Sequence, residues 1–543
     1  MDTATAARPL AVESSVSDPP LRFGGRSGRA LNPPDVPARL DPGLVAPTMP
    51  RIERSVEPMR LTQHLILAGC LVGLLGSPTG RSAELEYGPL VHDFKLTLAP
   101  GRRLEAAGPL VSYERRDTQT QWALSPLLSH AFDPGTEFEE FDLAYPLLTY
   151  DRFGSEYRFQ ILQVFSFAGG QNQQENAQKR FTLFPIYFQQ RSADPSLNYT
   201  AFVPFYGRLK NRLFRDEIRF ALFPLFSQSR KKDVVTDNYL YPFFHLRHGE
   251  ALRGWQFWPL AGFEHRDVTT RTNRDGDLQT LGGHNKLFLF WPVFFNQRVG
   301  LGTENSEHHQ ALLPFYSYVR SPRRDSSTFL WPLGLTITVD RAKEYREVGL
   351  PWPLIVFARG QGKTANRIWP LFSRAKTPIL QSDFFLWPLY KYNRAHASPL
   401  DRERTRILFF LYSDLIERNE QTHTALQRTD LWPLFTARRD HEGNERLQLF
   451  APLEPLLPNN RGIERNYSPL WSLWRSEANP KTGASSQSFL WNLYRHERTP
   501  QIRKCSLLFG LFQYQSGSEG GRLRVFYIPV AQTRKPTAGR SQP

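Results

Sequence analysis

The feature that most constrains this chain is an aromatic–Pro–Leu–aromatic unit, which recurs about every 19 residues from residue 87 onward. A period of this length is the signature of a repeat architecture. A single array can occupy a chain of 543 residues, which length alone would divide into three or four domains. Seven copies place a Trp before the Pro, and six of them are taken as structural anchors: Trp258, Pro259, Trp291, Pro292, Trp331, Pro332, Trp369, Pro370, Trp387, Pro388, Trp432 and Pro433.

The spacing of the copies is regular. Successive prolines between Pro185 and Pro259 lie 17 to 20 residues apart. The gap of 45 residues from Pro388 to Pro433 spans about two units, with a degenerate copy at 408–412, whereas the step from Pro259 to Pro292 is a long single step of 33 residues. That step contains a polar stretch at 267–285, which predicts a loop insertion. Weaker or degenerate copies include those at Pro89, Pro109, Pro126, Pro146, Pro204, Pro314, Pro353, Pro452, Pro469, Pro529, 408–412, 489–494 and 508–512.

The residues around each copy favour strands. Apolar runs of Phe, Tyr, Trp, Ile and Leu alternate with charged stretches and turn formers such as those at 440–444. A proline in every unit also prohibits long helices. We expect an all-β fold with one strand of about ten residues per unit, or about 20–24 antiparallel strands. A proline inside each strand would remove a ladder hydrogen bond, so it predicts a repeated bulge or corner.

The N-terminal region predicts export from the cytoplasm. Residues 1–48 lack apolar periodicity and indicate disorder or a start codon assigned too early. Residues 49–83 have the pattern of a signal peptide, with basic residues before an apolar run at 65–76 that is too short for a transmembrane helix. The β-repeat domain is then expected at 84–531, followed by a disordered tail at 532–543.

One cysteine lies inside that apolar run. The tetrapeptide Leu67-Ala68-Gly69-Cys70 resembles a bacterial lipobox, which implies lipidation of Cys70. The apolar run continues past Cys70, which departs from the usual lipobox context and leaves an ordinary signal-peptide cysteine as the alternative. The only other cysteine is Cys505, so the chain cannot carry a disulfide framework.

Two architectures fit these observations. The first is one large outer-membrane β-barrel, supported by the predicted signal peptide, the aromatic-rich strands and a mean hydropathy of −0.46. The second is a soluble β-repeat array, such as a propeller, a solenoid or a meandering sheet. Apolar residues on both faces of 220–226, and the cost of a proline at membrane depth, count against the barrel. The sequence leaves both open.

The sequence carries no catalytic motif. It lacks a phosphate-binding glycine loop, a nucleophile elbow and an H-E-x-x-H or C-x-x-C pattern. His308 and His309 are predicted to lie in a polar loop. We therefore expect a non-enzymatic protein without cofactor or metal.

The expected function follows from charge and export. The net charge of +16 predicts partners such as membrane lipid or lipopolysaccharide-like molecules, and export argues against nucleic acid. The first hypothesis is a bacterial outer-membrane barrel with a pore, transport or structural role. The alternative is a periplasmic or extracellular scaffold or binding module, with or without a lipid anchor.

Overall fold

The computed structural model describes residues 86–87, 90–170, 178–272, 278–518 and 520–534. All of them belong to the unit Ser82–Pro543. The predicted disordered segment 1–48, the predicted signal peptide 49–83 and Cys70 lie outside the described residues. Strand β46 extends to Arg534, slightly beyond the predicted end of the repeat domain at residue 531.

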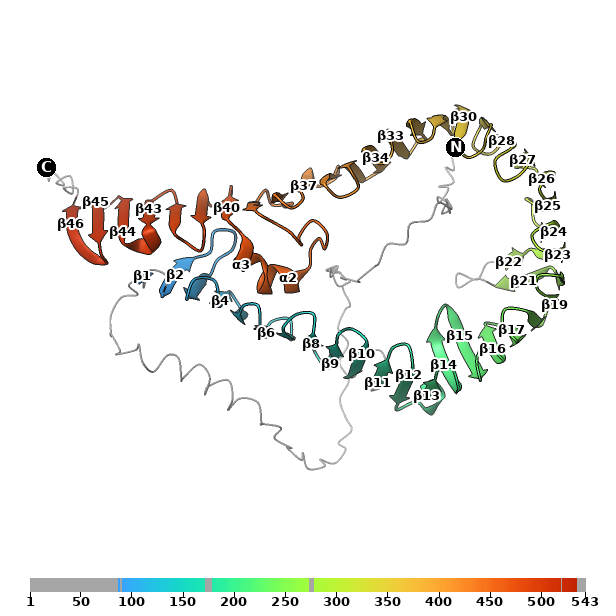
Figure 1. Cartoon of the computed structure of the whole chain (residues 1–543), viewed down its shortest axis with the longest axis horizontal. Coiled ribbons are helices and arrows are strands. Elements are labelled where there is room, and N and C mark those ends of the chain that lie inside the picture. The colour runs from blue at the N-terminus through green and yellow to red at the C-terminus, as the bar shows by residue number, and fades with distance from the viewer. Residues whose placement is uncertain (1–85, 88–89, 171–177, 273–277, 519, 535–543) are drawn as a thin grey trace, which may run out of the picture. The chain divides into compact units, whose positions relative to one another are not determined.

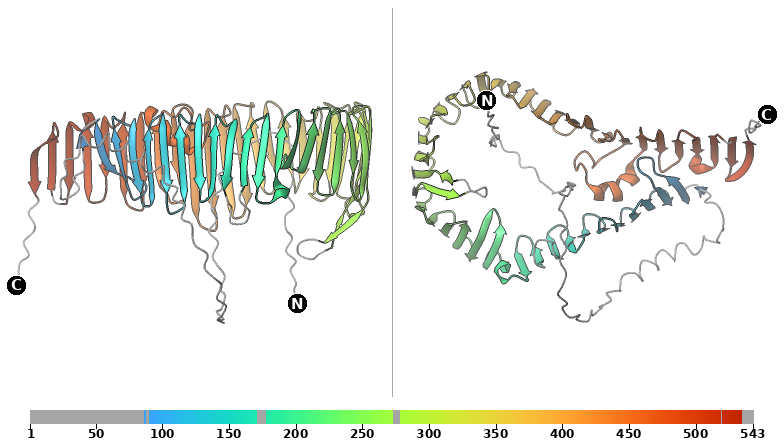
Figure 2. Two further views of the ribbon diagram at one scale, coloured as in Figure 1. Left: turned by 90° about the horizontal axis from the view of Figure 1, so that it is seen from below. Right: turned by 180° about the vertical axis from the view of Figure 1, so that it is seen from behind.

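The described residues form a nearly all-β structure, which confirms the predicted fold class. One antiparallel sheet contains 44 strands, and each strand pairs with the next one along the chain (Figures 1 and 2). The exception is a separate hairpin of β21 and β22, so that β20 pairs directly with β23. Among the described residues, no pairing joins β1 to β46, so the described sheet is not closed by hydrogen bonds between its first and last strands.

The strands are short. The first half of the chain contains β1 (Glu86–Tyr87), β2 (Val91–Lys95), β3 (Arg102–Ala106), β4 (Val111–Arg116), β5 (Gln119–Leu124), β6 (Leu128–Asp133), β7 (Phe138–Leu143), β8 (Leu148–Phe153), β9 (Glu156–Ile161), β10 (Phe165–Gly170), β11 (Gln178–Leu183), β12 (Tyr187–Ser192), the 3-10 helix η1 (Pro195–Leu197), β13 (Tyr199–Phe202), β14 (Tyr206–Arg212), β15 (Arg215–Ala221), β16 (Phe226–Lys231), β17 (Val234–Tyr239), β18 (Phe244–His248), β19 (Leu252–Phe257), β20 (Ala261–Arg266), β21 (Thr269–Thr272), β22 (Leu278–Leu281) and β23 (Gly283–Leu289).

The second half continues the same pattern. It contains β24 (Phe294–Leu301), β25 (Glu307–Leu312), β26 (Tyr316–Arg320), β27 (Arg324–Phe329), β28 (Leu335–Asp340), β29 (Tyr345–Gly349), β30 (Ile355–Gly360), β31 (Thr364–Ile368), β32 (Phe372–Lys376), β33 (Leu380–Phe385), β34 (Tyr390–Ala397), β35 (Leu400–Ile407), β36 (Tyr412–Asn419), β37 (Thr424–Leu431), β38 (Phe435–Arg439), β39 (Glu445–Leu449), α2 (Arg461–Asn466), α3 (Ser468–Trp471), β40 (Trp474–Asn479), β41 (Ala484–Phe489), β42 (Tyr494–Arg498), β43 (Ile502–Leu507), the 3-10 helix η2 (Leu508–Gly510), β44 (Phe512–Gly517), β45 (Gly520–Val525) and β46 (Ile528–Arg534).

The expected count of about 20–24 strands is wrong, because each repeat supplies two strands rather than one. The anchor proline lies in the turn between them, as Pro388 does between β33 and β34. A residue without an N–H is tolerated in such a turn, where it removes no ladder hydrogen bond. The apolar residues on both sides of the proline therefore belong to two strands, and the predicted mid-strand bulge is absent at these anchors.

Because consecutive strands are antiparallel, successive turns alternate between the two sides of the sheet at which the strands begin and end (Figure 2). We use the word edge for either of these two rows of turns and not for the first or last strand. The turns that contain the anchor prolines all lie at one edge, which we call the proline edge. The polar turns, such as 232–233 and 440–444, lie at the other, which we call the charged edge. The long step before Pro292 is accounted for by the hairpin β21–β22, so the predicted insertion at 267–285 contains its own strands.

Side chains change between charged and apolar along the length of each strand, and the two faces of the sheet do not differ in this respect. Strand β33 reads LQSDFF toward the proline edge, and β38 reads FTARR away from it. In β35 (LDRERTRI) and its partners, charged side chains occupy both faces. The pattern therefore places apolar groups near the proline edge and charges toward the charged edge.

The sheet has little apolar core. The buried hydrophobic cluster consists of Tyr199, Ala201, Leu209 and Phe220, and most other buried apolar side chains are alanines. Many buried side chains are instead polar, such as Ser129, Asp142 and Thr149. A single layer of strands leaves most large apolar side chains partly exposed.

One insertion interrupts the proline edge. Between β39 and β40 the chain forms the helices α2 and α3. The predicted weak repeat copy at Pro469 is therefore wrong, because Pro469 lies in α3. His308 and His309 also differ from expectation, since both lie in strand β25 and not in a loop.

Candidate functional site

The turns of the proline edge share one construction. In several of them the N–H of the residue after the proline donates to the carbonyl two residues before the proline, as in Leu225 to Leu222 and Leu389 to Leu386, both at 2.7 Å. The peptide bond before the proline is cis in most of them, including Trp258–Pro259 and Trp291–Pro292. Each repeat thus presents a compact turn with the aromatic ring and the following Leu at its tip.

Neighbouring turns are also hydrogen-bonded to each other. The N–H of Trp291 donates to the Pro259 carbonyl at 2.7 Å, and the N–H of Trp387 donates to the Pro370 carbonyl at 2.8 Å. Tyr241 donates in the same way to the preceding proline, Pro224. Because proline has no N–H of its own, this ladder satisfies the backbone groups at the tips of these turns.

The anchor rings touch along the edge. The ring centroids of Trp258 and Trp291, and those of Trp369 and Trp387, are each 6.1 Å apart. Trp387 also meets Phe409 of the degenerate copy at 408–412, with centroids 5.5 Å apart. Such pairs contribute about 0.5–1.5 kcal/mol beyond the area that they bury. The predicted degenerate copy is therefore a turn of the same edge.

The edge is apolar and exposed. Trp291 and Trp331 keep 50% and 44% of their surface in contact with solvent, and Leu330 keeps 67%. Other exposed apolar residues of these turns are Phe184, Ile186, Phe205, Leu222, Leu225, Leu240, Phe243, Val293, Phe315, Leu333, Leu371, Leu386, Leu389, Phe410, Leu434 and Phe526. A contiguous patch of this kind marks a surface that meets a partner or a membrane.

Sequence reasoning located this edge but not its geometry. All twelve anchor residues lie on it, and the structure brings Trp258 near Trp291 and Trp369 near Trp387. Trp432 contacts Phe410, with ring centroids 5.6 Å apart, and its indole nitrogen donates to the Pro452 carbonyl at 2.9 Å, at the start of the insertion. The anchors therefore form one apolar surface rather than separate sites.

A second region joins residues 92–145 to residues 460–498, and we call it the seam. It comprises the contacts of α2, its caps Asn460 and Tyr467, and β40–β42 with residues 92–145. The Arg465 guanidinium of α2 binds Glu140 at 2.9 Å, Ser129 at 2.8 Å and Asp142. The Asn466 amide also donates to Asp142, at 2.9 Å. Asp142 and Asn466 are almost completely buried.

The seam continues beyond the helices. Asn492 donates to Glu105 at 2.7 Å, and Arg495 lies 3.5 Å from the centroid of the Phe94 ring. Burial alone would lower the pKa of Arg465, but the adjacent carboxylates of Glu140 and Asp142 raise it above its ordinary value. The seam is thus held by ionic and polar contacts, and it has no large apolar core.

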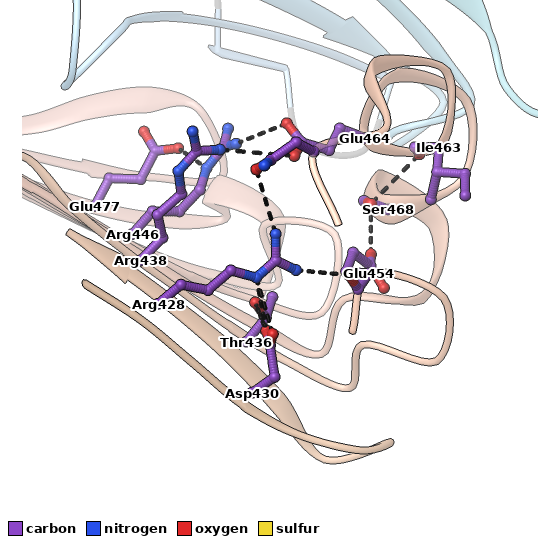
Figure 3. Close-up of polar contacts among 11 residues, drawn as sticks. Arg428, Asp430, Thr436, Arg438, Arg446, Glu454, Ile463, Glu464, Ser468 and Glu477 are labelled. Atoms are coloured by element: carbon purple, nitrogen blue, oxygen red, sulfur yellow. Dashed lines mark hydrogen bonds and ion pairs between the residues drawn. The ribbon is translucent and has the colours of Figure 1, made fainter. Parts of the chain in front are cut away.

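The insertion is fixed to its own strands by a further network (Figure 3). The Arg428 guanidinium binds Asp430 at 2.9 Å and the Glu454 carbonyl at 2.6 Å. The Glu454 carboxylate in turn accepts from Ser468 at 2.5 Å. Outside this network, Arg446 lies 3.7 Å from Glu464 and 3.1 Å from Glu477. Sequence reasoning missed all these residues, because no repeat or motif distinguishes them from other charged positions.

Among the described residues, no helix combines the length and the apolar character needed to cross a bilayer. Within the same part of the chain, no group of three or more His, Cys, Asp and Glu side chains is placed to hold a metal ion. No protein-family model matches the sequence, and no curated protein matches it either.

Proposed function

We propose that this chain is a non-enzymatic protein of the bacterial cell envelope that binds a lipid membrane through its proline edge. The observation that carries the proposal is the long row of exposed Trp, Phe and Leu side chains at one edge of the sheet. Interfacial proteins bury apolar side chains about 5–10 Å deep, at the boundary of headgroups and acyl chains. The turns and the first residue of each strand match that depth.

The backbone of this edge supports the proposal. Unpaired N–H and C=O groups are expensive in an apolar environment. At the proline edge the turn-to-turn hydrogen bonds pair these groups, as between Trp387 and Pro370, and proline itself brings no donor. Trp and Tyr are also the residues that favour membrane interfaces.

Positive side chains lie one residue behind the edge. Arg367, Lys391 and Arg406 each neighbour an edge residue in the strand, and Lys391 is the cross-strand partner of Arg406. At that depth they would meet lipid phosphates. Together with the net charge of +16, this favours anionic membranes.

A spanning outer-membrane barrel is the second candidate. The meander of antiparallel strands favours it, as does the contact of Tyr87 near β1 with Tyr527 near β46, whose ring centroids lie 6.1 Å apart. Against it, the longest strands of the described sheet have eight residues, and a spanning strand needs about 9–11. Charges on both faces of β35 also oppose a lipid-facing surface.

The test is flotation of the purified full chain with vesicles of phosphatidylglycerol and phosphatidylcholine. We expect the wild type to float, and to lose at least about tenfold in vesicle affinity when the six anchor tryptophans are replaced by Gln. Replacing Leu213 and Phe214 by Gln is the matched control, because both are exposed at the charged edge. Equal flotation of the six-fold variant and the wild type contradicts the proposal.

Edge binding and a spanning barrel predict different strengths of attachment to the membrane. An edge-bound protein is released from native membranes by alkaline carbonate and shows no shift on a heat-modifiability gel. A closed barrel resists carbonate and shifts on heating. Resistance to carbonate would therefore favour the barrel over edge binding.

A further inference from the structure

A cavity lies at the charged edge of β11–β14, on the sheet face that carries the Tyr199 cluster. It has a volume of about 380 Å³, and Arg180, Gln190, Tyr199, Lys210 and Arg212 contribute to its lining. Cavities that bind small molecules begin at about 300 Å³. The cavity is far larger than a single ion requires and matches a compact polar ligand.

Two arginines in the lining are held in place by hydrogen bonds from their Nε atoms to neutral groups. The Nε of Arg212 donates to the Tyr199 hydroxyl at 2.8 Å, and its guanidinium carbon lies 5.4 Å from the Phe188 ring centroid. The Nε of Arg180 donates to Gln190 at 3.1 Å. Gln190 is itself buried and donates to the Leu197 carbonyl at 3.3 Å. The guanidinium groups of Arg180 and Arg212 are thus oriented before a ligand binds.

Among the residues that the structure describes, no carboxylate belongs to the lining of this cavity, and Arg180, Lys210 and Arg212 form no ion pair there. The acid opposite Lys210 is Glu217, which pairs with Arg208 and Arg219. The loop carboxylate of Asp194 lies close enough to feel the charge of Lys210, but it accepts hydrogen bonds from Ser196.

From this arrangement we propose that the cavity binds a phosphate monoester on a small polar group, with Arg180 and Arg212 as the phosphate-binding forks. Guanidinium forks match phosphate oxygens in pairs, and pre-orientation lowers the cost of binding. Lys210 also belongs to the lining. The remaining volume accommodates a group about the size of a monosaccharide.

The proposal does not depend on membrane attachment, because the cavity opens at the edge opposite the prolines. It is tested by calorimetric titration of the full chain with glucose 6-phosphate and with glucose, in the absence of lipid. We expect saturable binding of the phosphate ester only. Arg180→Gln and Arg212→Lys are each expected to weaken it at least about tenfold. Arg208→Gln is the control, since Arg208 lies on the same strand but pairs with Glu217, and it should change affinity less than about twofold.

A second arm distinguishes a free ester from a lipid headgroup. Vesicles of phosphatidylcholine with and without phosphatidic acid are floated with the wild type and with Arg180→Gln. If only the phosphatidic acid vesicles respond to Arg180→Gln, the ligand is a lipid phosphate; if glucose 6-phosphate responds, it is a soluble ester. The proposal is overturned if neither probe responds to Arg180→Gln, or if Arg208→Gln weakens binding as much. Loss of flotation alone would bear on the proline edge and not on this cavity.

Discussion

The proline edge and the seam solve the same problem in opposite ways. Both hold neighbouring segments of the sheet together, yet the edge repeats one exposed apolar turn many times, and the seam occurs once and buries polar groups. At the edge, each ring contacts neighbours of its own kind, as Trp369 does with Trp387. In the seam, Arg465 depends on specific partners in β6 and β7. Because the rings of the edge make the same contacts many times, we expect the edge to tolerate the loss of one of them. The loss of one partner of Arg465 is expected to destabilise the whole seam.

The largest expected effect is therefore in the seam. Asp142→Ala leaves the buried Arg465 without one of its two carboxylates, and the Asn466 amide with the Gly462 carbonyl as its one remaining acceptor among the described residues. Breaking a buried pair in this way costs about 3–5 kcal/mol. The free energy of unfolding in urea, together with hydrogen exchange in β7 and α2, measures the loss.

Further variants test whether the loss of stability in Asp142→Ala comes from the buried charge of Arg465. Replacing both partners, Asp142→Leu with Arg465→Met, should recover part of the stability, because the buried guanidinium is removed together with Asp142, while the part-buried Glu140 loses its ion pair. Glu442→Ala should cost at most about 1 kcal/mol, since its ion pair with Lys481 is exposed. A loss of similar size for Asp142→Ala and Glu442→Ala would show that the seam is no more sensitive than the surface.

The next effect concerns the backbone of the proline edge. A Cβ at Gly334, in the turn after Trp331-Pro332, would collide with the carbonyl oxygens of Phe329 and Leu330. Gly334→Ala should therefore destabilise the protein by about 1–3 kcal/mol. Leu333→Ala is the control, since that exposed side chain should change stability by less than about 0.5 kcal/mol. Thermal unfolding compares them, and equal melting temperatures would mean that this turn relaxes freely.

A single ring at the same edge should matter less. Trp387→Ala removes ring contacts with Trp369 and Phe409, worth about 0.5–1.5 kcal/mol each. Because the other rings remain, vesicle affinity should fall only about threefold to tenfold. Flotation measures that change, and complete loss of binding would show that Trp387 forms a unique site and that the edge is not redundant.

The smallest effect is expected at a loop that belongs to neither region. The Ser196 hydroxyl, and then its backbone N–H, hold the pKa of Asp194 below its ordinary value. A lowered pKa means stability that is present above the ordinary carboxyl pKa and is lost as the pH falls through the lowered one. Ser196→Ala should raise the pKa of Asp194, which an NMR titration of the carboxyl carbon reports. An unchanged pKa would mean that the hydroxyl is not its main cause.

The sequence was sufficient for the repeat and for the all-β class, because the period and the strand-forming residues are local properties. It was not sufficient for the strand count. In a stretch such as LFLFWPVFF around Pro292, the apolar residues before and after the proline look like one strand. Only the pairing of Leu289 with Phe294 shows that they belong to two.

The seam and the cavity could not be predicted at all. Arg465 and Asp142 are 323 residues apart, and neither belongs to a motif. The helices α2 and α3 were also hidden by Pro452 and Pro469, whose spacing of 17 residues imitates the repeat. The cavity is formed by Arg180 and Arg212 from strands whose polar residues resemble those of every other repeat. Such sites arise from tertiary contacts between ordinary residues.

The hydrogen bonds from turn to turn have a consequence for how such a gene can change. Each unit offers a donor to one neighbour and an acceptor to the other, as Trp387 and Pro370 do. After the duplication or deletion of a unit, the units on either side therefore still present a matching donor and acceptor. The number of units can then change without compensating substitutions elsewhere in the array. The Arg465 network has no such duplicate. The number of repeat units can therefore change only if the units that carry the partners of Arg465 are retained.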